Sequence, residues 1–239
     1  FFQNGKDPAF YLDFVPDDKL KISYAASFAI DKIENDLKPF VKKKVERLNR
    51  VSVRESSALK ILADLGIVNS VQVLDPVFLL NRNFWEDTFI ESITENYIFV
   101  YDCDSNSTIK EIAKATAKKF NLKIFTVNQN IEYANKNYYK NGPEFFLSLI
   151  YNAKYVISNS LHAVAFSLIF NKIFFVVDRT ENINTRMRDI MNLIDLTELH
   201  LGVDQFKTFE NVTIDYQKVN EIINEKILES KLFLRESIH

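Results

Sequence analysis

Cysteine and glycine are both scarce in this sequence. There is one cysteine, Cys103, in 239 residues, and a single thiol can neither form a disulfide within the chain nor build a cysteine-based zinc site. With only four glycines, the sequence contains neither the G-x-G-x-x-G pattern nor a P-loop. Any phosphate that the protein binds must therefore be held by cationic side chains, hydroxyl groups and helix N-termini.

Long apolar runs and an excess of positive charge are also missing. No apolar run approaches the roughly 20 residues that a membrane-spanning helix needs, and the first residues lack the pattern of a signal peptide. Thirty Lys and Arg residues stand against thirty-two Asp and Glu, so no broad cationic face favours nucleic-acid binding. A lone cysteine is typical of a reducing compartment. These features predict a cytoplasmic protein without a nucleic-acid partner.

Strand and helix patterns alternate along the chain, and apolar residues, at 47%, suffice for a sizeable core. The apolar runs predict strands at 21–28, 51–54, 71–74, 97–101, 122–127, 155–157 and 173–177. The helical patterns cover 31–48 with an interruption at Pro39, 55–65 with a stop at Gly66, 107–120, 144–151, a stretch ending at Phe170, 185–193 and 215–236. This rhythm predicts an α/β fold with parallel sheets flanked by helices.

The rhythm is broken once, at a crossing segment over 75–85, and restarts at 97. We therefore predict two domains, over residues 1–85 and 86–239. The second reads as a complete doubly wound Rossmann-like unit, whereas the first has too few strands for one.

One polar turn lies where such folds bind ligands. Ser158–His162 follows a predicted strand and opens a predicted helix, and ligands of open α/β sheets collect outside the carboxyl ends of the strands. Its amides and hydroxyls would face an anion, and His162 could donate a hydrogen bond or act as a general acid. Cationic residues follow nearby in the sequence, at Lys172, Arg179, Arg186 and Arg188.

Each of these residues also has a plainer interpretation. A histidine beside an apolar helix is often a packed residue, and Arg186 with Arg188 could form a solvated helix face. Arg54, at the end of a predicted strand, could simply pair with Glu55 or Asp75. The patterns alone therefore support an α/β protein with a candidate anion site.

Several segments taken together resemble the polysaccharide pyruvyl transferase family. They are KISYAASF (21–28), VSVRE (51–55), LDPVFLL (74–80) with Trp85, the block 142–175, and NTRMRDIMNLIDL (184–196). The resemblance runs from about Phe10 to about Leu199. Members typically carry Ser-Phe-His-Gly after a small-residue strand, where this chain has Ser160-Leu161-His162-Ala163. Ala29 likewise stands where a glycine commonly follows Ser-Phe.

The resemblance implies a GT-B-like arrangement of two Rossmann-like domains and a definite reaction. Members transfer the enolpyruvyl unit of phosphoenolpyruvate to a sugar, forming a pyruvate ketal on two hydroxyls and releasing phosphate. The sugars belong to capsules, exopolysaccharides or cell-wall polymers. Acceptors are often lipid-linked or nucleotide-linked, so peripheral association with the inner face of the membrane is expected. The resemblance implies no cofactor, and the sequence shows no cluster of His and carboxylates that demands a metal.

The resemblance also implies roles for individual residues. His162 would be the acid or the phosphate-orienting group, and Arg54 an anion clamp on the donor. Ser160 would supply a hydroxyl or amide donor. Further substrate-binding candidates are Asn159, Lys172 and Arg186. We expect Arg54 and His162 to converge on one cavity.

Two other functions remain open at this point. Family members carry an asparagine-glycine-rich turn after the first strand and a later Gly-Ser-Asp segment, and Phe1 falls just past both, so residues 1–85 would be the remnant of an incomplete N-terminal domain. That favours an inactive scaffold or binding subunit, and it favours self-association as a homo-oligomer. The other alternative is a GT-B-type glycosyltransferase that uses a nucleotide sugar. Retention of Arg54, His162 and Lys172 favours the enzyme.

Overall fold

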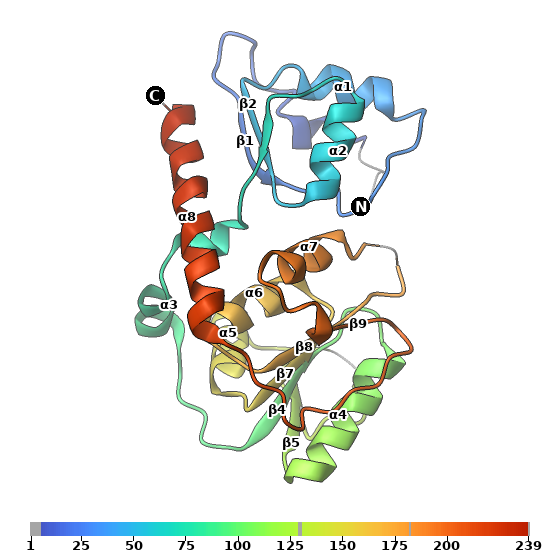
Figure 1. Ribbon diagram of the computed structural model, residues 1–239, viewed down its shortest axis with the longest axis vertical. Helices are drawn as coiled ribbons and strands as arrows, with labels where there is room; N and C mark the ends of the chain where they lie inside the picture. The colour runs from blue at the N-terminus through green and yellow to red at the C-terminus, as the bar shows by residue number, and fades with distance from the viewer. Residues whose placement is uncertain (1–5, 129–130, 182, 239) are drawn as a thin grey trace. The chain divides into compact units, whose positions relative to one another are not determined.

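The computed structural model describes residues 6–128, 131–181 and 183–238 (Figure 1). The chain divides into two units, which we call the first unit (Phe1–Leu79 with Ile223–His239) and the second unit (Leu80–Ile222). The division falls inside the last helix, α8 (Tyr216–Ile238). The end of this helix thus belongs with the first unit, an assignment that the predicted domain boundary after residue 85 did not include.

The first unit has a parallel sheet in the order β1-β2-β3. Its strands are β1 (Ile22–Ala26), β2 (Arg50–Val53) and β3 (Ser70–Gln72), and its helices before α8 are α1 (Lys38–Val45) and α2 (Ser56–Asp64). Apolar residues of α1, β2 and α2 form one buried cluster. Phe233 of α8 packs with Ala25 and Val73 in a second cluster. Helices α1 and α2 therefore pack on β2, and α8 packs on Ala25 and Val73, while β3 stays partly exposed.

The first helix of this unit begins later than we predicted. The sequence suggested a helix over 31–48 that Pro39 interrupts, but α1 starts at Lys38 and carries Pro39 in its first turn. Proline is favoured there because the first amides of a helix have no acceptor within the helix and its φ angle is already helical. Pro39 therefore marks the start of the helix. The predicted stop of α2 at Gly66 is confirmed, with φ at +82°.

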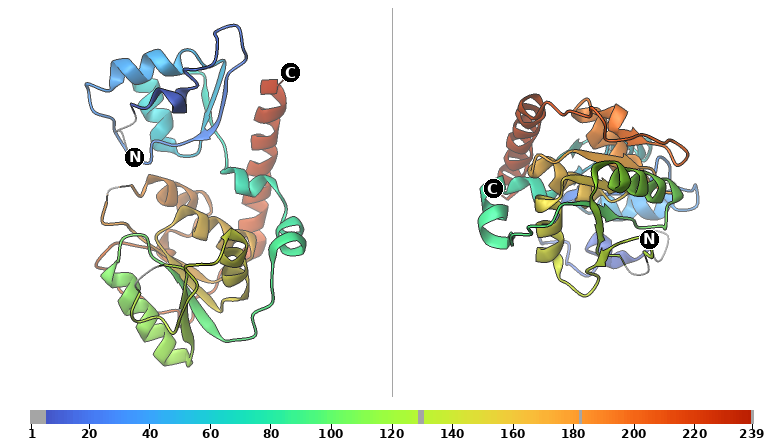
Figure 2. Two further views of the ribbon diagram at one scale, coloured as in Figure 1. Left: turned by 180° about the vertical axis from the view of Figure 1, so that it is seen from behind. Right: turned by 90° about the horizontal axis from the view of Figure 1, so that it is seen from below.

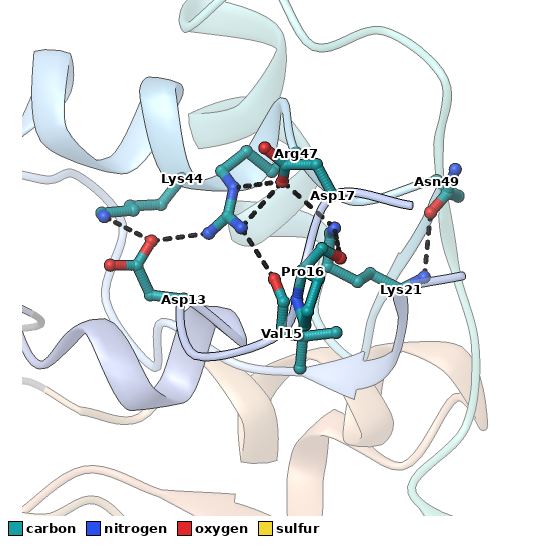
Figure 3. A network of polar contacts seen from close by, with 8 residues as sticks. All are labelled: Asp13, Val15, Pro16, Asp17, Lys21, Lys44, Arg47 and Asn49. Carbon is teal, nitrogen blue, oxygen red and sulfur yellow. Dashed lines mark hydrogen bonds and ion pairs between the residues drawn. The ribbon is translucent and has the colours of Figure 1, made fainter. Parts of the chain in front are cut away.

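A network of charged groups fixes the chain before β1 (Figure 3). The Lys21 side chain is buried, and its Nζ donates to the Pro16 carbonyl at 2.9 Å and to Asp17 at 3.3 Å. Arg47 donates to the same Asp17 carboxylate at 2.8 Å and to the Val15 carbonyl at 3.0 Å. These bonds lower the pKa of Asp17. Because Lys21 immediately precedes β1, the network lies at the amino end of this sheet.

The second unit contains the larger sheet, and its strands are all parallel. In the described residues the strand order is β6-β5-β4-β7-β8-β9. The strands are β4 (Tyr97–Tyr101), β5 (Lys123–Thr126), β6 (Lys136–Asn137), β7 (Tyr155–Ser158), β8 (Phe174–Val177) and β9 (His200–Leu201). This is the Rossmann order, and its topological switch point lies between β4 and β7. The predicted doubly wound α/β fold is thereby confirmed.

Helices cover both faces of this sheet (Figures 1 and 2). From β4 the order runs one way, through α4 to β5, and from β7 it runs the other way, through α6 to β8. Right-handed crossovers therefore place α4 and α6 on opposite faces. The helices are α3 (Arg82–Phe89), α4 (Ser107–Phe120), α5 (Pro143–Asn152), α6 (Leu161–Ile169) and α7 (Thr185–Leu193). Three short 3-10 helices, η1 (Pro8–Tyr11), η2 (Pro76–Leu79) and η3 (Thr197–Leu199), complete the described elements.

Gly66 gives a direct test of the end of α2. A Cβ atom there would meet Lys42 Nζ at an ordinary 3.6 Å, so the cost of Gly66→Ala comes from the left-handed backbone. We expect this change to lower the free energy of unfolding by about 1 kcal/mol. Gly202→Ala is the control, because Gly202 does not have a positive φ and its Cβ would likewise meet a side chain, that of Gln205, at an ordinary 3.6 Å. Urea unfolding that shows equal losses in the two variants would contradict this account.

Candidate active site

The junction of β7 and α6 forms the centre of the candidate site. β7 ends at Ser158 and α6 begins at Leu161, with Ser160 as the residue before the helix. Among the described residues no side chain caps the first amides of α6. His162 lies in the first helical turn and is exposed. This junction therefore offers an anion the amide end of a helix dipole, with a histidine beside it.

Asn159 fastens this junction to the loop that follows β4. Its side chain is fully buried, and its Oδ1 accepts a hydrogen bond from the Cys103 amide at 2.8 Å. Its Nδ2 donates to Asp104 at 2.5 Å and to Asp102 at 3.3 Å. The structure thus gives Asn159 the task of joining the two loops at the switch point.

The loop that follows β8 is tied to the same edge. Arg179 Nε donates to the Asn159 carbonyl at 3.0 Å, and Asp104 accepts from both the amide and the hydroxyl of Thr180, at 2.7 and 2.9 Å. Burial raises the pKa of Asp102. Three loops therefore form one bonded edge.

Sequence reasoning missed Asp102 and Asp104, although two acids directly after an apolar strand could have indicated them.

The structure separates the two secondary cationic candidates. Arg186 lies in the first turn of α7, and Asn184 just before that helix accepts from the Arg179 amide at 2.8 Å, so Arg186 belongs to the carboxyl edge. Lys172 instead precedes β8 and therefore lies at the amino edge of the same sheet. Its Nζ donates to the Tyr151 carbonyl at 2.8 Å. The fold does not bring Lys172 together with His162.

Arg54 is the candidate in the first unit, where it follows β2. Its Nε donates to the Ala25 carbonyl at 2.9 Å, and its Nη1 forms an ion pair with Asp75, whose side chain is 5% exposed. The pairing with Asp75 that the sequence left open is therefore confirmed. Arg54 and His162 belong to different units, and their convergence on one cavity stays a prediction.

Within 6–128, 131–181 and 183–238, no group of three His, Cys, Asp or Glu side chains is suited to hold a metal ion. In the same ranges, every helix is too short or too polar to cross a bilayer.

The sheet order, with a helix terminus at its switch point, defines a Rossmann-like α/β protein. Residues 1–181 match the family model described as polysaccharide pyruvyl transferase, and the chain belongs to this family. A search of curated proteins found no match. The family indicates a transferase of polysaccharide synthesis with a saccharide acceptor. The matched range includes Arg54, Asn159, Ser160, His162 and Lys172 and ends before Arg186.

The buried amine of Lys172 predicts a distinct dependence of stability on pH. Burial, and secondarily the charge of Arg82, lowers the pKa of Lys172 to about 8. Below pH 8 the amine is charged in both states and the cost of burying that charge is fully present. Above pH 8 the folded state loses its proton first, so stability rises with pH towards the unfolded value of about 10.4.

The comparison of wild type with Lys172→Met isolates this contribution. We expect the free energy of unfolding of the wild type, relative to the variant, to be larger at pH 9.5 than at pH 7. Urea unfolding at both pH values measures the gap. A gap that is the same at both pH values would show that the amine is not titrating in this way.

Proposed function

We propose that the protein transfers the enolpyruvyl unit of phosphoenolpyruvate to two hydroxyls of a saccharide, forming a pyruvate ketal and releasing phosphate. The product would belong to a capsule, an exopolysaccharide or a cell-wall polymer. The observation that carries the proposal is the exposed His162 in the first turn of α6, at the switch point of the sheet. Membership of the family supplies the class of reaction.

The donor explains why this edge would be cationic. Phosphoenolpyruvate has a carboxylate and a phosphate, and the amide end of α6 with the Ser160 hydroxyl suits one of these groups. Arg179 and Arg186 lie on the loop and helix that follow β8, where a second anionic group would be attracted. The bonded edge would hold these groups in place before the donor arrives.

The reaction can be written with every proton assigned. His162 delivers a proton to the methylene carbon of the enol, which makes the neighbouring carbon electrophilic. One sugar hydroxyl adds to that carbon, and the carbon–oxygen bond to phosphate breaks with its electron pair leaving on phosphate. The second hydroxyl then adds to the same carbon and closes the ring. Of the two hydroxyl protons, one replaces the proton of His162 and the other leaves with phosphate.

Arg54 would bind an anionic group of the substrate within the first unit. A guanidinium presents several donors in a fixed plane, which suits carboxylate and phosphate. The Ala25 carbonyl and Asp75 occupy two of its nitrogen atoms, Nε and Nη1. These two contacts would orient the Arg54 guanidinium. Asp75 would also neutralise part of its charge.

Phosphate release tests the proposal directly. We expect the wild type to release phosphate from phosphoenolpyruvate in the presence of a suitable acceptor, screened among β-galactosides and N-acetylmannosamine-linked precursors. His162→Ala should lower kcat by about 10²- to 10⁴-fold, the usual contribution of a general acid. His200→Ala is the matched control, because His200 lies in the same unit with its Nε2 held by Asp178 at 2.7 Å. This control should keep its turnover.

The outcomes separate the alternatives. Full turnover in His162→Ala would remove this histidine from the reaction. Consumption of a nucleotide sugar in place of phosphoenolpyruvate would favour a glycosyltransferase. A wild type that consumes neither donor, assayed beside an active member of the family, would favour a scaffold or binding subunit.

A further inference from the structure

Two alanines at the end of β1 have a backbone that alanine rarely adopts. Ala25 and Ala29 have φ angles of +52° and +61°, in the left-handed region. Non-glycine residues stay in this region only where the surrounding structure holds them there. Both residues lie at the carboxyl end of β1, beside the point where Arg54 follows β2. Something at this edge must therefore fix the backbone.

The Ala25 amide donates to the Ser52 hydroxyl at 3.1 Å, and at Ala29 the backbone is held by Glu55. Its side chain is fully buried at 0% exposure, and its Oε1 accepts three hydrogen bonds. The donors are the Phe28 amide at 2.7 Å, the Ala29 amide at 2.9 Å and the Ser27 hydroxyl at 2.9 Å. Bonds to an ionised oxygen are shorter and stronger than neutral ones. One carboxylate oxygen thus binds the whole turn Ser27–Ala29, which we call the β1 turn.

The second oxygen of Glu55 has a different environment. Oε2 is buried and has no hydrogen-bond partner among the described residues. A buried acceptor without a donor lowers stability, so a residue chosen for stability alone would be expected to satisfy both oxygens. All the hydrogen bonds that the Glu55 carboxylate accepts among the described residues therefore come from the β1 turn.

The β1 turn is joined to Arg54 by a bulge. The pairing of β1 with β2 changes register between Ser23 and Ala26. Within this irregular stretch, the Ala25 carbonyl accepts from Arg54 Nε at 2.9 Å and the Ala26 carbonyl accepts from the Arg54 amide at 3.1 Å. The direction of the guanidinium thus depends on how the end of β1 is turned.

We propose that Glu55 is a positioning residue for Arg54, acting through the β1 turn and the bulge at Ala25. Its effect on turnover rests on the proposed function, in which Arg54 binds an anionic group of the substrate. Glu55 itself does not touch the substrate. Its length is part of the role, because an aspartate at the same position is one methylene shorter and its carboxylate would not reach all three donors.

The first measurement needs no activity. Hydrogen exchange followed by NMR reports the amides of Phe28 and Ala29 and the Nε proton of Arg54. We expect Glu55→Gln to speed exchange at all three protons, because a neutral amide oxygen accepts more weakly than a carboxylate oxygen. Arg47→Met is the control, because Arg47 belongs to the network at the amino end of this sheet (Figure 3). It should leave these three protons unchanged.

The second measurement is kinetic. In Glu55→Ala and Glu55→Asp we expect kcat/KM for phosphoenolpyruvate to fall by about 10- to 100-fold, as displaced groups usually cause. The KM for the acceptor should stay within about twofold. In the Arg54→Ala background, Glu55→Ala should cause no further loss, because both changes remove the same interaction. Arg47→Met should keep wild-type kinetics.

Hydrogen exchange and kinetics test the positioning role and the proposed function separately. If the Arg54 Nε proton exchanges at the wild-type rate in Glu55→Gln and Glu55→Ala, Glu55 does not position Arg54, whatever the enzyme does. If exchange changes while kcat/KM does not, or if the losses of Glu55→Ala and Arg54→Ala add, the role is structural and the proposal is overturned. A wild type without turnover overturns the proposed function, and the exchange experiment still decides the positioning.

Discussion

The parallel pairing of β4 with β7 is the constraint on which the rest of the second unit depends. The two strands run side by side from Ile98 opposite Tyr155 to Tyr101 opposite Ser158. The chain leaves them towards opposite sides of the sheet, and this is the place where open α/β sheets bind their ligands. Asn159 joins these loops from within, and Arg179 and Thr180 add the loop of the next strand. The register of β4 and β7 therefore sets the positions of the side chains at this edge.

In the proposed function, a chain with few glycines binds its anionic donor without a glycine-rich turn. Rossmann folds commonly use glycine-rich turns to bring backbone amides to phosphate, whereas here the first turn of α6, a histidine and the arginines near β8 stand at the equivalent edge. The first unit also lacks glycine where the backbone would favour it. Ala25 and Ala29 adopt backbone angles that suit glycine, and the buried carboxylate of Glu55 holds the turn between strand and helix. In the first unit, side-chain hydrogen bonds thus hold a backbone that glycine would adopt more readily.

The sequence was informative where local patterns decide the structure. β4, α4 and α7 lie at the predicted residues, because each has a clear apolar run or helical face, and α4 is also bounded by Asn106 and Asn121. It was uninformative for β6 and β9, since two residues form no pattern. It also missed what depends on distant contacts. It did not indicate that Asn159 is a buried link between loops, and the contact of Asn159 with substrate stays a prediction, while Lys172 lies at the far edge from His162. The union of the end of α8 with the first unit rests on packing against Ala25 and Val73, which local patterns do not encode.

The central claim is that the amide end of α6, with His162, receives the anionic donor. A crystal structure of the protein with phosphoenolpyruvate tests it most directly. The account predicts phosphate or carboxylate oxygens within hydrogen-bond distance of the first amides of α6 and of the His162 ring. Phosphoenolpyruvate bound at another place, with His162 and the start of α6 untouched, would contradict it.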